Sequence, residues 1–396
     1  MAKALDDVIV LDLTQVLAGP FAVTILADFG ADVIQIEPVG GDYGRRLFST
    51  YNKKLMRLDN WNTRRNRRGM SLNLRSQKGK EIFLELVKKA DVVVQNFSPG
   101  AMERLGLGYD VMKEANPGII YCAMSGYGQT GPAKDQLAYD GRIQADSGLM
   151  SMTGFPENPP VKVGIPVADY AGATYAVIGI LLALHYKERT GKGQMVDAAM
   201  FDAICKWTVG EIRLVEMSGK DRNGNHHPMV APSGVYETKD NQYISYGAQT
   251  DAQWESFLKL VGKEEFIAEK WDYSTRLQRN DEIEPWAKEW ARSKTLEEAM
   301  RELTEARLVG NGITRAIELE TNPQVLEREM YNVVDDPECG EIKGVVGVTP
   351  KLSETPGSIG TAQNIPELSQ HTEEILSELL GYSKKEISKL KEEGVV

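Results

Sequence analysis

The sequence predicts an α/β protein that contains a mostly parallel β-sheet and a second, smaller α+β domain. Two observations support this fold class. In the first half of the chain, apolar strand-like runs alternate with helical segments, a pattern that produces right-handed βαβ units and a sheet covered on both faces. Near residues 229–325 the pattern changes to a hairpin followed by amphipathic helices, which predicts the smaller domain.

The elements of the parallel sheet follow one another along the first half. DVIVLDL (7–13) is a β-branched apolar strand, and PFAVTILADFG after it is typical of a helix that ends at glycine. ADVIQIEP (31–38) predicts a strand stopped by proline, and residues 78–90 place apolar side chains at helical spacing. DVVVQNF (91–97) and GIIYCAMSGYG (118–128) are two further buried strands.

Long helices replace this alternation from about residue 169. The polar, turn-rich segment SGKDRNGNHHP (218–228) is typical of a linker. In SGVYETKDNQYISYG (233–247), alternating residues flank a Lys-Asp-Asn turn, which predicts a β-hairpin. Amphipathic helices follow to about 308, and the tail returns with two charged amphipathic helices, HTEEILSELL and SKKEISKLKEE.

Composition and charge exclude several classes of protein. With 396 residues, 42% of them hydrophobic, the chain can bury a sizeable core. The net charge of −11 argues against a binder of nucleic acid or acidic lipid. Three dispersed cysteines and four histidines show no metal or disulfide spacing. Because we find no signal-peptide pattern, and the longest apolar stretch (171–184) is too short to span a membrane, we expect a cytoplasmic protein.

Asp169 precedes a long apolar helix in GIPVADYAGATYAVIGILLALH. Aspartate is a favoured N-cap residue, and capping alone would explain this position. A catalytic interpretation is compatible with capping. The helix dipole and backbone N–H groups keep a carboxylate ionised there, and covalent catalysis on a thioester requires an ionised carboxylate.

Three segments at predicted strand ends are candidate ligand loops. Gln15–Pro20 (QVLAGP) joins the first strand to its helix, where open α/β folds place their sites. SGYGQTGP (125–132) and YGAQT (246–250) contain glycine, which allows close backbone approach to a ligand. Each of the three is also compatible with a plain turn.

NTRRNRRG (62–69) gathers four arginines within five positions of an acidic protein. Arginine forks match phosphate geometry, so Arg67 and Arg68 are candidate contacts to a phosphate-bearing ligand. A solvated charged run is the alternative, and the sequence leaves both interpretations open.

Taken together and in order, these segments resemble the class III CoA-transferase family over essentially the whole chain. The resemblance rests on seven stretches in register: VLDLTQVLAGPFAVTILADFGADVIQIEP, NRRGMSLNLRSQKGKEIFLELVKKADVVVQNFSPG, GLGYDVMKEANPGIIYCAMSGYGQTGP, SGLMSMTG, VADYAGATYAVIGILLAL, GKGQMVDAAMFDA and QHTEEIL. The resemblance implies an enzyme that moves coenzyme A from an acyl-CoA donor to a carboxylic acid, with the CoA thioester as substrate and no tightly bound cofactor.

The resemblance also implies roles for single residues. The implied catalytic residues are Asp169, Gln15, Gly247 and Ala248, and the implied CoA-binding residues are Val16, Ala18, Asn96, Phe97, Arg104, Tyr139 and Met200. Asp169 falls on the family's catalytic aspartate. Gly247, Ala248 and Gln249 match a glycine loop that covers the site during turnover, although this loop has only one glycine here.

Family members combine a large Rossmann-like domain, made from both chain ends, with a small domain, and two subunits interlock. We therefore expect an interlocked dimer, either a homodimer or a heteromer with a related subunit. The expected boundaries are 1–217 and 326–396 for the large CoA-binding domain, 218–228 for the linker and 229–325 for the small domain.

The implied chemistry passes through aspartyl–acyl anhydride and aspartyl–CoA thioester intermediates, which conserve the thioester's energy if water is excluded. Three alternatives stay open. One is an acyl-CoA racemase or epimerase, which needs a histidine–aspartate pair, whereas this chain has Tyr139 at the histidine's place. The second is a non-catalytic CoA-binding subunit of a hetero-oligomeric transferase. The third is intramolecular transfer of CoA between the two carboxylates of one diacid.

Arg142 bears on the choice of substrate. A buried arginine after Tyr139 would pair with the second carboxylate of a dicarboxylate such as succinate. The alternative is a surface arginine paired with Asp146, one helical turn further on. Formate/oxalate, carnitine and 2-hydroxyacid pairs also remain open.

Overall fold

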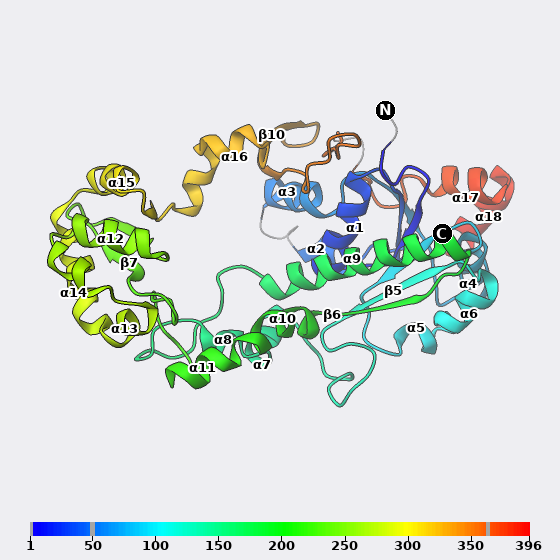
Figure 1. The fold of residues 1–396 in the computed structure, drawn as a ribbon. Helices are drawn as coiled ribbons and strands as arrows, with labels where there is room; N and C mark the ends of the chain where they lie inside the picture. Colours follow the sequence, from blue (N-terminus) through cyan, green and yellow to red (C-terminus); the bar gives the residue numbers. More distant parts are fainter. Residues whose placement is uncertain (1–2, 48–51, 362–364) are drawn as a thin grey trace. The chain divides into compact units, whose positions relative to one another are not determined.

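The structure, a computed structural model, describes residues 3–47, 52–361 and 365–396, which form two compact units (Figure 1). The first unit comprises Met1–Ser147, Gly164–Lys206 and Glu320–Val396, and the second comprises Gly148–Val163 and Trp207–Leu319. These boundaries differ from the expected ones. Residues 148–163 and 207–217 belong to the second unit rather than to the large domain, and residues 320–325 belong to the first unit.

The first unit is built on a six-stranded sheet in which every neighbouring pair is parallel. The strand order is β3-β2-β1-β4-β5-β6, which is the order of doubly wound dinucleotide-binding folds. The strands are β1 (Ile9–Asp12), β2 (Asp32–Glu37), β3 (Arg67–Ser71), β4 (Val92–Gln95), β5 (Ile120–Ser125) and β6 (Met195–Ala199). Sequence order reverses direction between β1 and β4, and such folds bind ligands at this switch point, outside the carboxyl ends of the strands.

The central strands are buried on both faces. All four residues of β4 are buried, as are five of the six residues of β5. Helices must therefore cover both faces, which explains the continuous apolar runs of the sequence. The predicted parallel strands and the α/β fold class are confirmed.

One face of the sheet is covered by helices from both parts of the first unit. Side chains of α4 (Gln77–Val87), α17 (Thr372–Leu380) and α18 (Lys384–Glu392) share one apolar cluster with strand residues. Figure 1 shows α17 and α18 beside α4. The backbone N–H of Asn73 also donates to the carbonyl of Val395 at 2.8 Å. The large domain is thus made from both the first and the last segments of the chain, as predicted.

The long helix α9 (Val167–Thr190) packs against α1 (Ala18–Asp28) and strands β5 and β6. Its buried positions are mostly small, such as Ala171, Gly172 and Ala176, so α1 and the sheet approach closely. At its first turn the rings of Tyr170 and Phe21 meet edge-to-face with centroids 4.8 Å apart. By length and composition α9 could cross a membrane, but this packing makes it a covering helix of the sheet.

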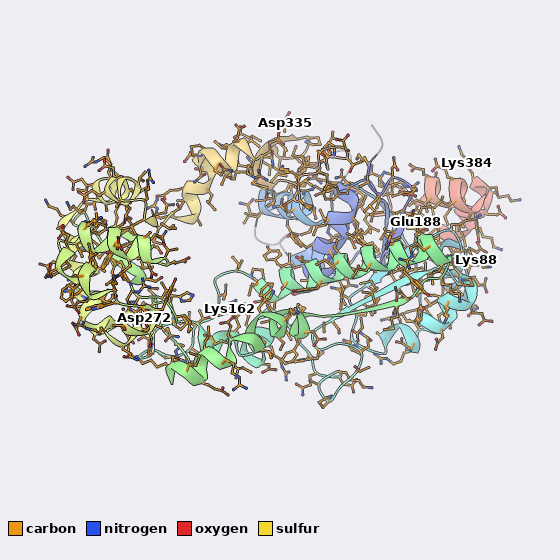
Figure 2. The ribbon with its side chains drawn as sticks, viewed as in Figure 1. Lys88, Lys162, Glu188, Asp272, Asp335 and Lys384 are labelled. Atoms are coloured by element: carbon orange, nitrogen blue, oxygen red, sulfur yellow. The ribbon has the colours of Figure 1, made fainter. Side chains whose placement is uncertain are left out.

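Charged side chains lie on the outer faces of these helices. Figure 2 shows Lys88 at the end of α4, Glu188 on α9 and Lys384 on α18, and all three are exposed. The opposite faces of α4 and α18 carry apolar residues that pack on the sheet, which is the amphipathic pattern expected of covering helices. The outer face of α9 differs, because it also exposes apolar side chains such as Leu182.

The second unit has its own core around an antiparallel sheet of order β7-β8-β9. Strands β7 (Ser233–Glu237) and β8 (Tyr243–Gly247) form the predicted hairpin. Its remaining strand and longer helices are β9 (Val309–Gly312), α12 (Asp251–Leu260), α14 (Asn280–Ser293) and α15 (Leu296–Glu305). Tryptophans from three segments, Trp254, Trp271 and Trp290, fill the core.

The segment 218–228, expected as a linker, is packed within the second unit. The guanidinium of Arg222 donates to the carbonyls of Phe155 and Asn158 at 3.2 and 3.0 Å. The N–H of Gly224 donates to the carbonyl of Gly154 at 3.1 Å. These bonds fasten the segment to residues 148–163, so the linker interpretation is wrong. A polar, turn-rich composition does not reveal partners about 70 residues away.

Candidate active site

A cavity of about 470 Å³ lies in the first unit at the carboxyl ends of four sheet strands. Its wall comes from the segments that follow β1, β4, β5 and β6, together with the loop 135–139 and the first turn of α9. The sequence-predicted residues that line it are Gln15, Val16, Ala18, Asn96, Phe97, Arg104, Tyr139, Asp169 and Met200. Nine predicted residues from distant parts of the sequence therefore share one cavity, at the switch point between β1 and β4.

Asp169 occupies the first turn of α9, three residues after the N-cap position held by Pro166. It is therefore not the N-cap, and that interpretation is wrong. Burial, together with the nearby carboxylate of Asp140, raises the pKa of Asp169 to about 6. This shift is opposite in direction to the one expected from the helix dipole. A carboxylate with this pKa is still mostly ionised at pH 7, and burial leaves it poorly solvated.

Asp140 supplies the cap that Asp169 does not. One of its carboxylate oxygens accepts the backbone N–H of Ala168 at 2.9 Å, in the first turn of α9. The other accepts the side-chain amide of Gln144 at 2.7 Å. Asp140 begins α7 (Asp140–Asp146), so it links α7 to the turn that carries Asp169. Sequence reasoning missed this residue, because its partner lies 28 positions away.

Gln15 and Asn96 join the two strands of the switch point. The N–H of Gln15 donates to the side-chain carbonyl of Asn96, and the Asn96 amide donates to the Gln15 carbonyl, both at 2.8 Å. The next residue, Val16, has a φ of +68°, which is rare for a β-branched residue and costs on the order of 1–3 kcal/mol. The QVLAGP segment is therefore a constrained part of the cavity wall.

Phe97 and Arg104 lie on the same side of the switch point as Asn96. Arg104 is the last residue of α5 (Ala101–Arg104) and is exposed. Among residues 3–47, 52–361 and 365–396, it forms no ion pair, so its guanidinium is available to an anion. Phe97 is half-buried and presents an aromatic surface to the same cavity.

Tyr139 and Met200 line the cavity on the β5 and β6 side. Tyr139 precedes α7 and is 78% exposed, whereas Met200 is buried. A Cβ on Gly172 would lie 2.8 Å from the Met200 side chain, so glycine on α9 makes room for this residue. Ser125 and Gly126, from the predicted SGYGQTGP segment, also line the cavity.

Arg67 and Arg68 do not reach this cavity, which corrects their prediction as phosphate contacts. Arg67 is buried and pairs with Asp12 at 2.5 Å. Arg68 pairs with Asp32 at 2.5 Å and with Glu374 at 3.0 Å. The solvated-run alternative also fails for Arg67, since its guanidinium lies inside the protein. The carboxylates that pair with Arg67 and with Arg68 lie far from them in the sequence, so the pattern of residues alone does not reveal these ion pairs.

Gly247 and Ala248 lie at the end of β8 in the second unit, whereas every residue that lines the cavity belongs to the first. Gly247 pairs with Ser233 across the hairpin, and the N–H of Ala248 donates to the Pro232 carbonyl at 3.0 Å. The segment 246–249 is thus partly strand in this structure. Its covering role stays a prediction.

Arg142 is exposed rather than buried, and Asp146 lies 3.4 Å from its Nε. The surface-pair alternative is therefore confirmed. Its guanidinium also donates to the phenol oxygen of Tyr127 at 2.9 Å and to the carbonyl of Leu137 at 3.0 Å. Arg142 supports the cavity wall at residue 137 but does not line the cavity.

Comparisons with known proteins identify a family and several similar proteins. A family model described as CoA-transferase family III matches residues 5–372. Succinyl-CoA–D-citramalate CoA-transferase from Chloroflexus aurantiacus is 34% identical, covering 100% of this chain and 98% of that protein. Succinyl-CoA:mesaconate CoA-transferase from Haloarcula marismortui is 35% identical over 95% of this chain and 96% of that protein. The crystal structure of a CAIB/BAIF family protein from Brucella suis superposes with a TM-score of 0.78 and 29% identity, covering 96% and 100% of the two chains.

Proposed function

The chain belongs to CoA-transferase family III, and from that premise we propose that it transfers CoA from succinyl-CoA to a carboxylic acid through Asp169. The family membership makes the chain a CoA-transferase that acts on CoA thioesters. The single observation that carries the proposed mechanism is the place of Asp169, which is ionisable, poorly solvated and on the wall of the cavity.

Asp169 has the properties of a nucleophile for a thioester. Its carboxylate accepts no hydrogen bond from any residue in the described ranges, so both oxygens are available to a substrate. Burial and the Asp140 charge raise its pKa to about 6, which destabilises the charged form and makes it more nucleophilic than a solvated carboxylate. It is nevertheless ionised in most molecules at pH 7.

The proposed reaction has four covalent steps. An Asp169 oxygen attacks the donor thioester carbonyl, the C–S bond breaks, and a mixed anhydride and CoA thiolate form. The thiolate attacks the Asp169 carbonyl, giving an aspartyl–CoA thioester and free succinate. The acceptor carboxylate then attacks this thioester and releases the thiolate. Attack of the thiolate on the acceptor carbonyl gives the new acyl-CoA and restores Asp169.

Four cavity residues are proposed to hold the CoA portion of the substrates. Arg104 would pair with phosphate, because a guanidinium fork matches phosphate oxygens. Phe97 offers a surface for adenine stacking. Asn96 and Gln15 fix the loop beside the thioester through their two mutual hydrogen bonds. Local basic contact is needed because the chain carries a net charge of −11.

We propose a dicarboxylate acceptor, supported by the named substrates of similar proteins. Proteins 34% and 35% identical to this chain are succinyl-CoA transferases for citramalate and mesaconate, and both acceptors carry two carboxylates. Arg142 is not proposed to recognise the second carboxylate, since it is paired with Asp146 at the surface.

We further propose an interlocked homodimer in the cytoplasm. The outward face of α9 carries apolar side chains, including Leu181 and Leu182, which are 42% and 66% exposed, and burial in a partner would remove this surface from water. A protein 34% identical is named as the beta subunit of a succinyl-CoA–L-malate CoA-transferase, so sedimentation of the purified chain alone tests the homodimer. Cys122, Cys205 and Cys339, all within the described ranges, form no disulfide, which fits a reducing compartment.

The test of function uses succinyl-CoA and a panel of acids that includes citramalate, mesaconate, malate, oxalate and formate. New CoA esters are followed by mass spectrometry for the wild type, Asp169→Asn and the control Asp110→Asn, which alters an exposed carboxylate in the first turn of α6 (Tyr109–Ala115). We expect ester formation in the wild type and the control and none in Asp169→Asn.

Isotope transfer tests the covalent route. An acceptor labelled with ¹⁸O in its carboxylate should leave one labelled oxygen in the peptide that contains Asp169 after a single turnover. Ester formation without that label would contradict the aspartyl anhydride. Exchange of an α-proton without ester formation would instead indicate a racemase, and CoA binding without either reaction would indicate a non-catalytic subunit.

A further inference from the structure

The loop between β1 and α1 carries backbone strain where it meets the cavity. Val16 has a φ of +68°, a conformation that crowds a β-branched side chain against its own backbone. Gln15 and Leu17 on either side of it also line the cavity. Such a conformation persists only where the surrounding structure holds it in place, so the contacts that hold this loop have a task beyond packing.

Arg67 contacts the chain on both sides of this strained loop. Its Nη1 donates to Asp12 at the end of β1 at 2.5 Å. Its Nη2 donates to the carbonyl of Pro20 at 2.6 Å and to the hydroxyl of Thr24 at 2.7 Å, both on α1. Arg67 and Asp12 are 3% and 0% exposed, so water does not compete for these bonds.

Asp12 extends the same network into the loop itself. Its second carboxylate oxygen accepts the backbone N–H and the hydroxyl of Thr14 at 2.8 and 2.6 Å. The Thr14 side chain packs against Gly19 so closely that a Cβ at residue 19 would lie 2.4 Å from the Thr14 Cβ, so only glycine fits there. The two ends of the segment 14–20 are therefore fixed at a short separation, and the intervening residues must bulge toward the cavity.

We propose that Arg67, with Asp12, is a positioning residue for CoA transfer, holding the strained Gln15–Leu17 backbone against the reacting thioester. This inference rests on the proposed function of the cavity. Within the described ranges, Arg67 hydrogen-bonds to none of the residues that line the cavity. It acts through its bonds to Pro20 and Thr24, and through Asp12 on Thr14. A planar fork is required, because a lysine ammonium cannot occupy the places of Nη1 and Nη2 together.

The first test compares Arg67→Lys with the matched control Arg65→Lys. Arg65 is also buried, pairs with Asp28 at 2.6 Å and donates to the Val346 carbonyl at 2.8 Å, but it does not contact the segment 14–20. We expect Arg67→Lys to lower kcat roughly 10- to 100-fold, the effect of displacing a reacting geometry by about 1 Å, with KM for succinyl-CoA changed less than about threefold. Arg65→Lys should keep the wild-type kcat.

Val16→Gly tests whether strain is what Arg67 holds. Glycine adopts a positive φ without steric cost, so the loop needs less support. We expect the double variant Arg67→Lys/Val16→Gly to have a higher kcat than Arg67→Lys alone, a coupling that loss of stability would not produce. If the change in kcat of the double variant equals the product of the changes in Arg67→Lys and Val16→Gly measured singly, the proposal is overturned.

Two further measurements keep the test decisive. If Arg67→Lys does not fold, Thr24→Val removes one acceptor of Arg67 at similar volume, and it should lower kcat in the same direction but by less. Amide hydrogen exchange of residues 14–17 should be faster in the folded variant of Arg67 or Thr24 than in Arg65→Lys. Unchanged exchange, or a wild-type kcat in both Arg67→Lys and Thr24→Val, would overturn the proposal. A wild type that transfers CoA to no acid would refute the proposed function, while the exchange result would still decide whether Arg67 holds the loop.

Discussion

Asn96 and Gln15 exchange two hydrogen bonds, each 2.8 Å long, across the gap between the ends of β4 and β1. These are the two strands between which the order of the sheet changes direction. The side chain of Asn96 and the backbone of Gln15 therefore join the ends of these two strands at the switch point. It also holds both residues on the wall of the cavity that contains Asp169.

Replacing Asn96 with alanine should lower kcat/KM for CoA transfer by roughly 10- to 100-fold. The change leaves a backbone donor and acceptor of Gln15 unpaired, at a cost of about 1–3 kcal/mol, and frees the loop. Steady-state kinetics with succinyl-CoA measure the effect. Asn116→Ala is the control, because the Asn116 side chain also bonds the backbone outside the cavity: it donates to the carbonyls of Val87 and Ala90 and accepts the N–H of Gly118. Equal losses in both variants would show that the effect is general destabilisation.

The pH dependence of kcat/KM should show an acidic limb near the pKa of Asp169. Burial first and the Asp140 charge second raise this pKa to about 6, and only the ionised carboxylate attacks a thioester. Activity should therefore fall as pH drops through about 6. Asp140→Asn removes the neighbouring negative charge, which makes ionisation of Asp169 easier, so the limb should move to lower pH. An unmoved limb would mean that Asp140 has no electrostatic influence on the catalytic group.

Asp169→Asn should be more stable than the wild type at pH 8. The folded-state pKa of Asp169, about 6, lies above the ordinary value of 3.8. The folded protein is therefore more stable with the protonated carboxyl, and this stability is lost as pH rises through about 6. One pKa unit corresponds to about 1.4 kcal/mol. Since Asp169 is only partly buried, solvent screening makes the actual effect smaller than this conversion gives. We expect the free energy of unfolding of Asp169→Asn to exceed that of the wild type by about 1–2 kcal/mol.

Denaturant unfolding of both proteins at pH 8 and pH 4 measures this effect. The difference between Asp169→Asn and the wild type should nearly vanish at pH 4, where the wild-type carboxyl is protonated. Asp110→Asn, which alters an exposed carboxylate, is the control for loss of a surface charge. A gain that is the same at both pH values would come from packing rather than from charge.

Arg104→Ala should raise KM for succinyl-CoA by about 10- to 100-fold while kcat changes little. A phosphate contact stabilises substrate and transition state equally, so its loss appears in KM. Raising the salt concentration should weaken binding less in the variant than in the wild type. Arg189→Ala, which removes an exposed arginine in the last turn of α9, is the control. A lower kcat with an unchanged KM would place Arg104 nearer to the reacting carbonyl than to the phosphates.

The sheet was predictable from sequence because its signals are local, whereas cavity residues such as Arg104 and Tyr139 followed only from the resemblance to the family. Apolar runs such as those of β4 and β5 predict strands by themselves, and ligand residues follow the ends of these strands. The roles of Arg67 and Arg68 were not predictable, because an arginine run looks the same whether it faces phosphate, water or buried carboxylates. Only the fold brings Asp12 and Asp32, 55 and 36 positions away, to these side chains.

The capping role of Asp140 and the packing of the segment 218–228 could not be predicted, and the physical reason is the same for both. A carboxylate that caps a helix normally precedes it directly, whereas Asp140 caps α9 from another helix. The hydrogen bonds of Arg222 to residues 155 and 158 likewise carry no trace in the local sequence. Backbone strain at Val16 is also invisible there, since valine is ordinarily a strand residue.

The division of the first unit between early and late segments has a consequence for biosynthesis. A ribosome adds residues 207–319, the larger part of the second unit, before it reaches α17 and α18, which together with α4 cover one face of the parallel sheet. At about 5–20 residues/s, translation from residue 207 to 371 takes roughly 10–30 s. During that interval the nascent sheet, with Asp169 already synthesised, leaves the part of this apolar face that α17 and α18 later cover open to water and to chaperones, while the second unit can already bury its core.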